Sequence, residues 1–462
     1  TVIDNNATAM ENLAISKGLN FVRIDPRITR NDHDGTLDVT FAIVRGERVF
    51  VERIDIEGNT TTLDSVVRRQ FSTVEGDPLN PAQIRNAAER IRALGYFSDV
   101  AVTAGSGDSA DQAVVKVAVT EQPTGSVSFG VTYGVSNGFG ANLGFSEPNF
   151  LGRGQSLDVS VQSGTSTVDS RVVFTDPAFL GRDVSFSFRA EYASSNSDHS
   201  NYDTRSTTLS PSLGFPLSDN QRLKLAYTLS QDSISNVDTP NSSVILQKEA
   251  GTSVTSSLGY SYSFDNRTSS VNPGGGFLFR FGQDFAGLSG DTTYINTSIL
   301  ALAQTKVLQD QVALRAIFEG GYLQGISGYD TTVTERYFGN GKVRGFEPNG
   351  IGPRDQGAVN NDALGGNIYA VVHFETDFPI GLPEEYGITG GAFVDVGSVW
   401  GLDDTAGTTG TVDDAFHLRS VVGLTVYWTT PIGPLRLDFT HALKKEAYDK
   451  EQTFDLTLAT KF

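Results

Sequence analysis

Side chains that could carry covalent chemistry are scarce in this sequence of 462 residues. It contains no cysteine, so disulfides and thiolate metal sites are excluded. Its five histidines form no pair with the spacing of a zinc site and no evident Ser-His-acid set; they are His33, His199, His373, His417 and His441. The nearest pair, His441 with Asp438, has an odd spacing that places the two side chains on opposite faces of a strand. We therefore expect no enzyme activity and no cofactor.

The glycine-rich segment RYFGNGKVRGFEPNGIGPRD, residues 336–355, indicates a mechanical role rather than a catalytic one. One of its cations, Arg344, looks buried and lies within the run Val343, Arg344, Gly345 and Phe346. Arginine has a planar fork of donors that can hold two carboxylates at once. The alternative is a solvated loop cation. The segment belongs to a loop predicted over residues 324–363, and loops of such length are usually functional.

Alternating strands surround this loop from Gly125 to Phe462. In the first of them Val127, Phe129, Val131 and Tyr133 alternate with small polar residues, so one face is apolar and the other polar. This alternation is typical of transmembrane β-strands that face lipid outward and a lumen inward. Such segments number about sixteen, and the connections between them alternate between tight turns and long loops, as in single-chain outer-membrane barrels.

Composition supports this class. The chain has 49 glycines and one methionine, which is unlike a soluble α/β enzyme. It contains no apolar run of about 18 residues, so it encodes no transmembrane helix and could span a membrane only as a closed β-barrel. A net charge of −19 argues against nucleic-acid binding. A soluble β-sandwich is the alternative, but it predicts shorter strands.

The first 122 residues have a different pattern. Residues 49–122 read as strand, two helices and two strands, the order β-α-α-β-β of a small soluble domain. The second helix is well marked, because Asn80 suits an N-cap and Pro81 the first helical position. Residues 1–47 look like the tail of the same unit, which indicates a repeat array cut within a repeat. The chain begins TVIDNN, without the features of a signal peptide, and we expect it to be a mature fragment.

Strand parity predicts which side chains enter the lumen. In VVHFETDF, Val372 and Phe374 should face outward, which turns His373, Glu375 and Asp377 inward. In GAFVDVGSVW the same rule places Asp395 inside.

Several motifs resemble a known family. VRRQF, GDPLNPAQI and LGYFSDV look like a POTRA domain, and LGRG, VRGF, FVDVGSVW, PIGPLRLDF and the terminal Phe resemble the BamA family in this order. The VRGF run alone is shared with related two-partner secretion transporters and translocation-assembly proteins. The resemblance implies a partial POTRA domain at residues 1–47, the fourth, a fifth at 48–122, and a transmembrane barrel at 123–462.

The resemblance also implies a function. Members of the BamA family fold and insert β-barrel proteins into the bacterial outer membrane, with the POTRA part in the periplasm. The implied partners are unfolded outer-membrane proteins, accessory lipoproteins docking on POTRA units, periplasmic chaperones and the lipid bilayer. By the same resemblance the long loop folds into the lumen, where Arg344 pairs with Glu375 and Asp395. The alternative is a polypeptide-secretion or translocation pore of the related POTRA-barrel transporters.

A second functional feature is a lateral seam between the first and last strands, 125–134 and 451–462. In the family this seam opens so that an incoming strand adds to the exposed edge by backbone hydrogen bonding. The residues expected at the seam are Gly125, Val127, Phe129 and Gly130 on the first strand, and Phe454, Leu456, Leu458 and Phe462 on the last. An ordinary closed seam is the alternative.

Overall fold

The computed structural model describes residues 2–16, 22–31, 36–45, 49–134, 138–196, 199–267, 274–430 and 433–459. Contacts divide the chain into two compact units. The first comprises Thr1–Gly125 with Glu147–Gln155, and the second comprises Ser126–Ser146 with Ser156–Phe462. None of the described helices is both long enough and apolar enough to cross a membrane.

The first unit contains the predicted β-α-α-β-β order. It is formed by β3 (Phe50–Glu57), α2 (Asp64–Arg68), α3 (Pro81–Ala93), β4 (Phe97–Ser106) and β5 (Gln112–Glu121). Strand β5 lies between β3, to which it is parallel, and β4, to which it is antiparallel. Buried aliphatic side chains of α2 and α3, among them Val67 and Ile91, pack against the sheet.

Helix α3 begins as its sequence predicts. The side chain of Asn80 accepts hydrogen bonds from the backbone N–H groups of Ala82 and Gln83, and Pro81 occupies the first turn. Gly95, just past the helix end, has a φ of 73°, which a glycine adopts without strain. Before this domain lie α1 (Val2–Ser16), β1 (Val22–Asn31) and β2 (Thr36–Arg45), the last two paired antiparallel. The assignment of these elements to a fourth POTRA domain stays a prediction.

Glu121, the last residue of β5, stabilises the loop before α2. Its carboxylate accepts hydrogen bonds from the Thr60 hydroxyl at 2.7 Å and from the backbone N–H groups of Thr61 and Thr62 at 2.9 and 2.6 Å. Burial alone would raise the pKa of Glu121, but these hydrogen bonds outweigh it and lower the pKa to about 2. The stabilisation is therefore complete above the ordinary value of 4.5 and is lost as the pH falls toward 2.

We accordingly predict that Glu121→Gln lowers the unfolding temperature of the first unit at pH 7 and reduces the loss of stability between pH 4.5 and 2. Differential scanning calorimetry of the whole chain at several pH values measures both effects. The exposed helix carboxylate Glu89 provides the control, since Glu89→Gln should leave the unfolding temperature nearly unchanged. Equal pH dependence in wild type and Glu121→Gln would refute the assignment.

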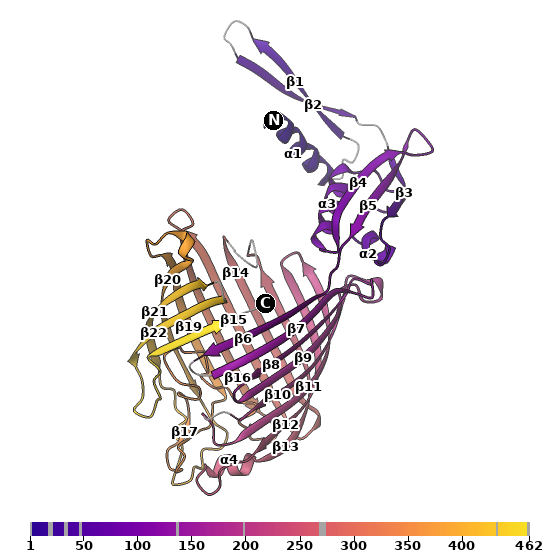
Figure 1. Cartoon of the computed structure of the whole chain (residues 1–462). Helices are drawn as coiled ribbons and strands as arrows, with labels where there is room; N and C mark the ends of the chain where they lie inside the picture. The colour runs from indigo at the N-terminus through magenta and orange to yellow at the C-terminus, as the bar shows by residue number, and fades with distance from the viewer. Residues whose placement is uncertain are drawn as a thin grey trace. The chain divides into compact units, whose positions relative to one another are not determined.

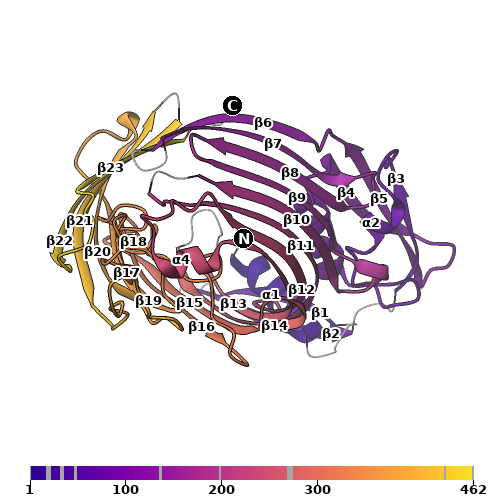
Figure 2. The same ribbon diagram turned by 90° about the horizontal axis from the view of Figure 1, so that it is seen from below.

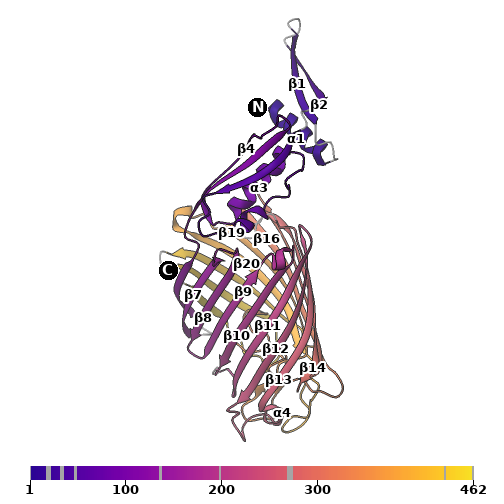
Figure 3. The same ribbon diagram turned by 90° about the vertical axis from the view of Figure 1, so that its right-hand side faces the viewer.

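The second unit is a closed antiparallel barrel of sixteen strands, as predicted (Figure 1). Neighbouring strands lie side by side and tilted, which Figure 3 shows for β7 to β14. The strands are β6 (Ser126–Gly134), β7 (Gly138–Phe150), β8 (Gln155–Gly164), β9 (Thr167–Asp176), β10 (Ser185–Ser195), β11 (Asp203–Ser218), β12 (Gln221–Ser235), β13 (Gly251–Asp265), β14 (Gly275–Gly290), β15 (Tyr294–Val307), β16 (Val312–Gly325), β19 (Ile368–Pro379), β20 (Ile388–Trp400), β21 (Arg419–Thr430), β22 (Gly433–Lys444) and β23 (Phe454–Ala459).

The alternation of side chains follows the predicted parity. Val127 and Phe129 are 71% and 51% exposed on the outer face, and Phe374 is 55% exposed. Between such outward residues lie buried inward ones, including His373 and Asp395. The interior is less polar than expected, because Val371, Val399 and similar side chains also point inward and pack against the long loop.

The long loop begins and ends later than predicted. It joins β16 to β19 over residues 326–367, rather than 324–363, because β16 stays paired with β15 up to Gly325 and β19 begins only at Ile368, opposite Tyr322. The loop contains two short paired strands, β17 (Arg354–Asp355) and β18 (Asp362–Ala363). In Figure 2 both lie inside the ring of barrel strands.

Candidate functional site

Arg344 lies at the centre of the site. Its guanidinium donates to both carboxylate oxygens of Asp395, from Nε at 2.7 Å and from Nη2 at 2.5 Å, and its backbone N–H reaches the same carboxylate at 3.1 Å. A further nitrogen, Nη1, lies 2.9 Å from Oε1 of Glu375. The structure therefore brings together the three residues that the sequence singled out. Their side chains are 15%, 0% and 20% exposed for Arg344, Asp395 and Glu375, so the charges interact with little screening by water.

Apolar contacts hold the same loop against the barrel wall. Val343 and Phe346 are buried against inward side chains of β19, β20 and β21. The guanidinium of Arg344 also stacks on the ring of Phe393, 3.6 Å from its centroid. Gly345 has a φ of +84°, and a Cβ there would lie 2.9 Å from the Val421 side chain, so this position suits only glycine.

Three further residues of the site were not identified from the sequence. His373 contacts Asp395 through Nδ1 at 2.9 Å, and Arg315 bridges Glu375 and Asp377 at 3.1 and 2.6 Å. Phe393 forms the stacking surface described above. Parity already placed His373 on the inner face, but the pairing with Arg315 depends on strand register, which the sequence does not reveal.

The loop also binds the segment that leads into the last strand. The Gln452 N–H donates to the Gly345 carbonyl at 3.0 Å, and the Glu347 N–H donates to the Lys450 carbonyl at 2.9 Å. Phe346 and Glu451 form an isolated antiparallel bridge. The last strand consequently starts at Phe454 and not at Glu451, because residues 450–452 pair with the loop instead of with a barrel strand.

The lateral seam between β6 and β23 is short. Among the described residues it consists of three pairs, Thr457 with Gly134, Leu458 with Tyr133, and Ala459 with Thr132. The next ladder, between β6 and β7, has nine pairs, and that between β15 and β16 has fourteen. Because each backbone hydrogen bond is worth about 0.5–1.5 kcal/mol net, the described part of the β6–β23 seam is held less strongly than either of these ladders.

Most of the predicted seam residues lie on β6 or β23. Among the described ones, Leu458 alone is part of the ladder between these two strands. Val127, Phe129 and Gly130 lie on the part of β6 that pairs with β7 but with no described residue of β23. On β23, Leu458 is in the ladder, whereas Phe454 and Leu456 pair with β22. Gly125 precedes β6, and Phe462 lies outside the described residues.

A cavity of about 370 Å³ lies directly behind the seam. Its wall includes Gly134 of β6, Asp455 and Thr457 of β23, and Arg344 and Phe346 of the loop. The loop, the last strand and the first strand thus meet around one space.

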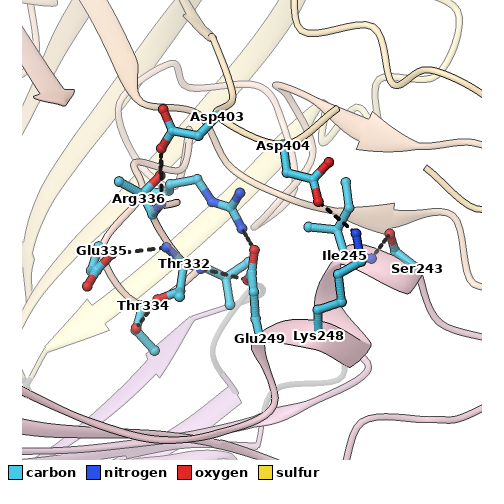
Figure 4. Close-up of polar contacts among 12 residues, drawn as sticks. Ser243, Ile245, Lys248, Glu249, Thr332, Thr334, Glu335, Arg336, Asp403 and Asp404 are labelled. Carbon is cyan, nitrogen blue, oxygen red and sulfur yellow. Dashed lines mark hydrogen bonds and ion pairs between the residues drawn. The ribbon is translucent and has the colours of Figure 1, made fainter. Parts of the chain in front are cut away.

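A group of loops covers one end of the barrel, and their polar contacts are drawn in Figure 4. It includes the helix α4 (Val244–Glu249) between β12 and β13. Glu249 forms a buried ion pair with Arg336 of the long loop and accepts a hydrogen bond from the Val333 N–H at 3.0 Å. An apolar cluster that includes Leu246 and Leu364 lies in the same group of loops. The long loop is therefore fastened through Arg336 to α4 as well as through Arg344 to the wall.

The Arg336–Glu249 pair should be costly to break. Burial raises the pKa of the Glu249 carboxyl above its ordinary value, although Arg336 and the Val333 N–H counteract this effect. We predict that Arg336→Met destabilises the protein by about 3–5 kcal/mol at neutral pH, because it leaves a buried carboxylate without its cation. Since the raised pKa lets Glu249 take up a proton as the pH falls, the loss should be smaller at pH 5.

Urea unfolding followed by tryptophan fluorescence measures this effect. The double variant Arg336→Met with Glu249→Gln should regain most of the lost stability. The neighbouring cation Lys248 provides the control. Its side chain pairs with Asp404 but is 61% exposed, so Lys248→Met should lower the free energy of unfolding by less than about 1 kcal/mol. Equal losses for Arg336→Met and Lys248→Met would contradict the prediction.

One unit of the chain contains a POTRA-like domain, and the other is a closed sixteen-stranded barrel with an inward loop. This combination defines a class of transmembrane β-barrel proteins. Comparison with family models agrees with this class. The Omp85 superfamily domain matches residues 149–462, and the POTRA model, described as surface antigen variable number repeat, matches residues 49–122. The chain belongs to the Omp85 superfamily.

Curated relatives with similar sequences include outer membrane protein assembly factors called BamA. The protein from Neorickettsia risticii is 31% identical over all of this chain and 61% of its own length, and that from Neisseria meningitidis serogroup B is 26% identical over 98% of this chain and 62% of its own. The human sorting and assembly machinery component 50 homolog is 25% identical over 73% of each chain. The chain thus spans about three fifths of the length of the BamA relatives.

Solved structures share the fold. A crystal structure of BamA from Haemophilus ducreyi lacking POTRA domains 1–3 has a TM-score of 0.78 and 22% identity, covering 99% of this chain and 94% of that one. CdiB from Escherichia coli has a TM-score of 0.57 and 18% identity, covering 100% of this chain and 84% of that one. The barrel with its N-terminal POTRA-like part is common to both.

Proposed function

We propose that this protein is an assembly factor that folds β-barrel proteins and inserts them into the bacterial outer membrane. The observation that carries the proposal is the seam of three described residue pairs, where the ladder between β15 and β16 has fourteen. A short ladder opens at low free-energy cost and exposes the backbone groups of β6. An incoming strand can then pair with that edge by β-augmentation, which demands little of its sequence.

The inward loop supplies the second part of the mechanism. Arg344 fastens the loop to the wall through Asp395 and Glu375, and Gly345 and Glu347 bind residues 450–452 ahead of the last strand. In our proposal the loop holds β23 at this end while its other end separates from β6. No covalent chemistry is required, so the role is one of assembly and not of enzymatic catalysis.

The relatives support this assignment, since several carry the name outer membrane protein assembly factor. We place the barrel in the outer membrane and the POTRA-like domains in the periplasm. The expected partners are unfolded outer-membrane proteins, accessory lipoproteins and periplasmic chaperones that interact with the POTRA-like domains. We divide the chain into POTRA-like domains at 1–47 and 48–122 and a barrel at 123–462.

A polypeptide-secretion pore is the second candidate function. The fold of CdiB from E. coli is similar, although its TM-score is lower than that of the H. ducreyi BamA structure. In this protein the lumen contains the long loop, whose Val343 and Ile351 are buried against inward side chains. A continuous lumenal path would require that packing to be broken, which favours the seam over the lumen as the route.

Reconstitution in lipid vesicles tests the choice between the two functions. Urea-denatured substrate barrels are added from the side that carries the POTRA-like domains, and the vesicles are then treated with protease. An assembly factor produces folded substrate barrels within the bilayer, whereas a secretion pore delivers unfolded substrate to the opposite aqueous side. Lumenal delivery without folded insertion would overturn the proposal.

A further inference from the structure

Arg354 of the long loop is a buried cation that forms no ion pair with a described carboxylate. It is 4% exposed, and no Asp or Glu forms an ion pair with it among the residues the structure describes. Its guanidinium donates to two carbonyl groups, those of Asn361 at 2.6 Å and of Asn349, and its Nε has no hydrogen-bond partner. Carbonyl dipoles compensate a buried positive charge only in part, and buried charges are usually paired.

Two nearby carboxylates, those of Asp362 and Asp449, are engaged by other donors. Asp362 accepts from the Asn201 amide at 2.9 Å and from the Ser243 N–H at 2.6 Å. Asp449 forms two hydrogen bonds with Arg419, each of 2.9 Å. Burial consequently lowers the pKa of Arg354, even though Asp449 and Asp362 act in the opposite direction.

A polar cavity of about 120 Å³ adjoins this cation. Its lining includes Arg354, the exposed cation Lys450 and the side chains of Asn201, Asn349 and Asn361, together with Asp362. The Asn361 side-chain oxygen is also buried without a partner. Rotation of this amide by half a turn would exchange its oxygen and its NH₂ group, so that it could donate to a bound anion.

We propose that this cavity binds a phosphate group or a similar tetrahedral oxyanion between Arg354 and Lys450. The volume is about four times the roughly 30 Å³ that one water occupies in the liquid, enough for such an ion. Arg354 supplies a buried donor that lacks a partner, and Lys450 supplies a second charge at the mouth. The phosphate comes either from free inorganic phosphate or from a lipid headgroup, because both present the same oxygens.

Lys450 also connects the site to the seam. Its backbone N–H donates to the Gly350 carbonyl of the long loop, and its carbonyl accepts from the Glu347 N–H. Two residues further along the chain, the Gln452 N–H donates to the Gly345 carbonyl of the same loop. An anion held by Arg354 and Lys450 would therefore reinforce the attachment of the loop to the segment that precedes β23. This consequence rests on the proposed function, whereas binding of the anion does not.

Equilibrium dialysis of the purified protein with radiolabelled inorganic phosphate tests the proposal, in maltoside micelles with sodium chloride holding the ionic strength constant. Wild type should bind one phosphate per chain. Arg354→Gln should lose saturable binding, and Lys450→Gln should bind about tenfold more weakly. Lys445→Gln is the matched control, since Lys445 is an exposed lysine of the same segment outside the cavity lining, and it should bind as wild type does.

Competition then identifies the source of the phosphate. Displacement by dihexanoyl phosphatidic acid at much lower concentration than by glycerol 3-phosphate assigns the site to a lipid headgroup, and equal displacement assigns it to free phosphate. Absence of saturable phosphate and sulfate binding by wild type would overturn the proposal and leave water as the occupant. Unchanged binding in Lys450→Gln would also overturn it, even if Arg354→Gln failed to fold.

Discussion

Arg344→Ala should release the long loop from the barrel wall. The variant leaves Asp395, which is fully buried, and Glu375 without the guanidinium that holds both. Removal of one partner of a buried ion pair costs about 3–5 kcal/mol. If that loss falls on docking of the loop, the population of the undocked state rises by a factor of about 150 to 5,000. We expect assembly activity to fall with it, because the loop also holds residues 450–452.

Trypsin cleavage after Lys342 measures the undocked population. Lys342 lies in the docked loop next to the buried Val343, so cleavage of the folded barrel requires the loop to open. Asp395→Asn should accelerate cleavage as Arg344→Ala does. Asp377→Asn is the control, because Asp377 contacts Arg315 and not Arg344. Equal resistance of Arg344→Ala and wild type to trypsin would refute the role assigned to this arginine.

Amide hydrogen exchange should differ sharply between the two edges of β6. Its amides that point to β7 belong to a nine-pair ladder, whereas those that point to β23 belong to a ladder of three described pairs. Each backbone hydrogen bond is worth about 0.5–1.5 kcal/mol, so an edge with even a few bonds less opens much more often. We therefore expect the amides of β6 that face β23 to exchange about 100-fold faster or more than those that face β7. The comparison within one strand removes differences in depth and lipid contact.

Residue-resolved exchange in micelles provides this measurement. The ladder between β15 and β16, with fourteen pairs, is the slow reference. Similar protection on both edges of β6 would indicate an ordinary closed seam, the alternative that the sequence left open.

Period-two alternation explains why much of the site could be predicted. Parity alone places Asp395 and Glu375 inside and Phe374 outside, because a strand turns successive side chains to opposite faces. The N-cap of α3 is local as well, since Asn80 contacts residues two and three positions ahead. The pairing of Arg344 itself came from the family resemblance, because alternation cannot tell which loop enters the lumen.

Register and loop docking account for what the sequence did not reveal. Arg315 meets Glu375 only because the two strands pair in one register, and a shift of one residue would turn the side chain to lipid. The short seam is equally hidden, since β23 has the alternation of an ordinary strand. Residues 450–452 resemble the start of that strand, yet their backbone groups bind the loop.

A reversible lock across the seam tests the account most directly. The chain has no cysteine, so Gly134→Cys with Thr457→Cys places a single pair at directly opposite positions of β6 and β23. Leu437→Cys with Leu456→Cys, opposite one another on β22 and β23, locks a ladder that need not open and serves as the control. Insertion of substrate barrels into vesicles should stop when the seam pair is oxidised, resume on reduction, and continue in the control. Full insertion with the seam completely oxidised would contradict the account and show that assembly proceeds without opening this seam.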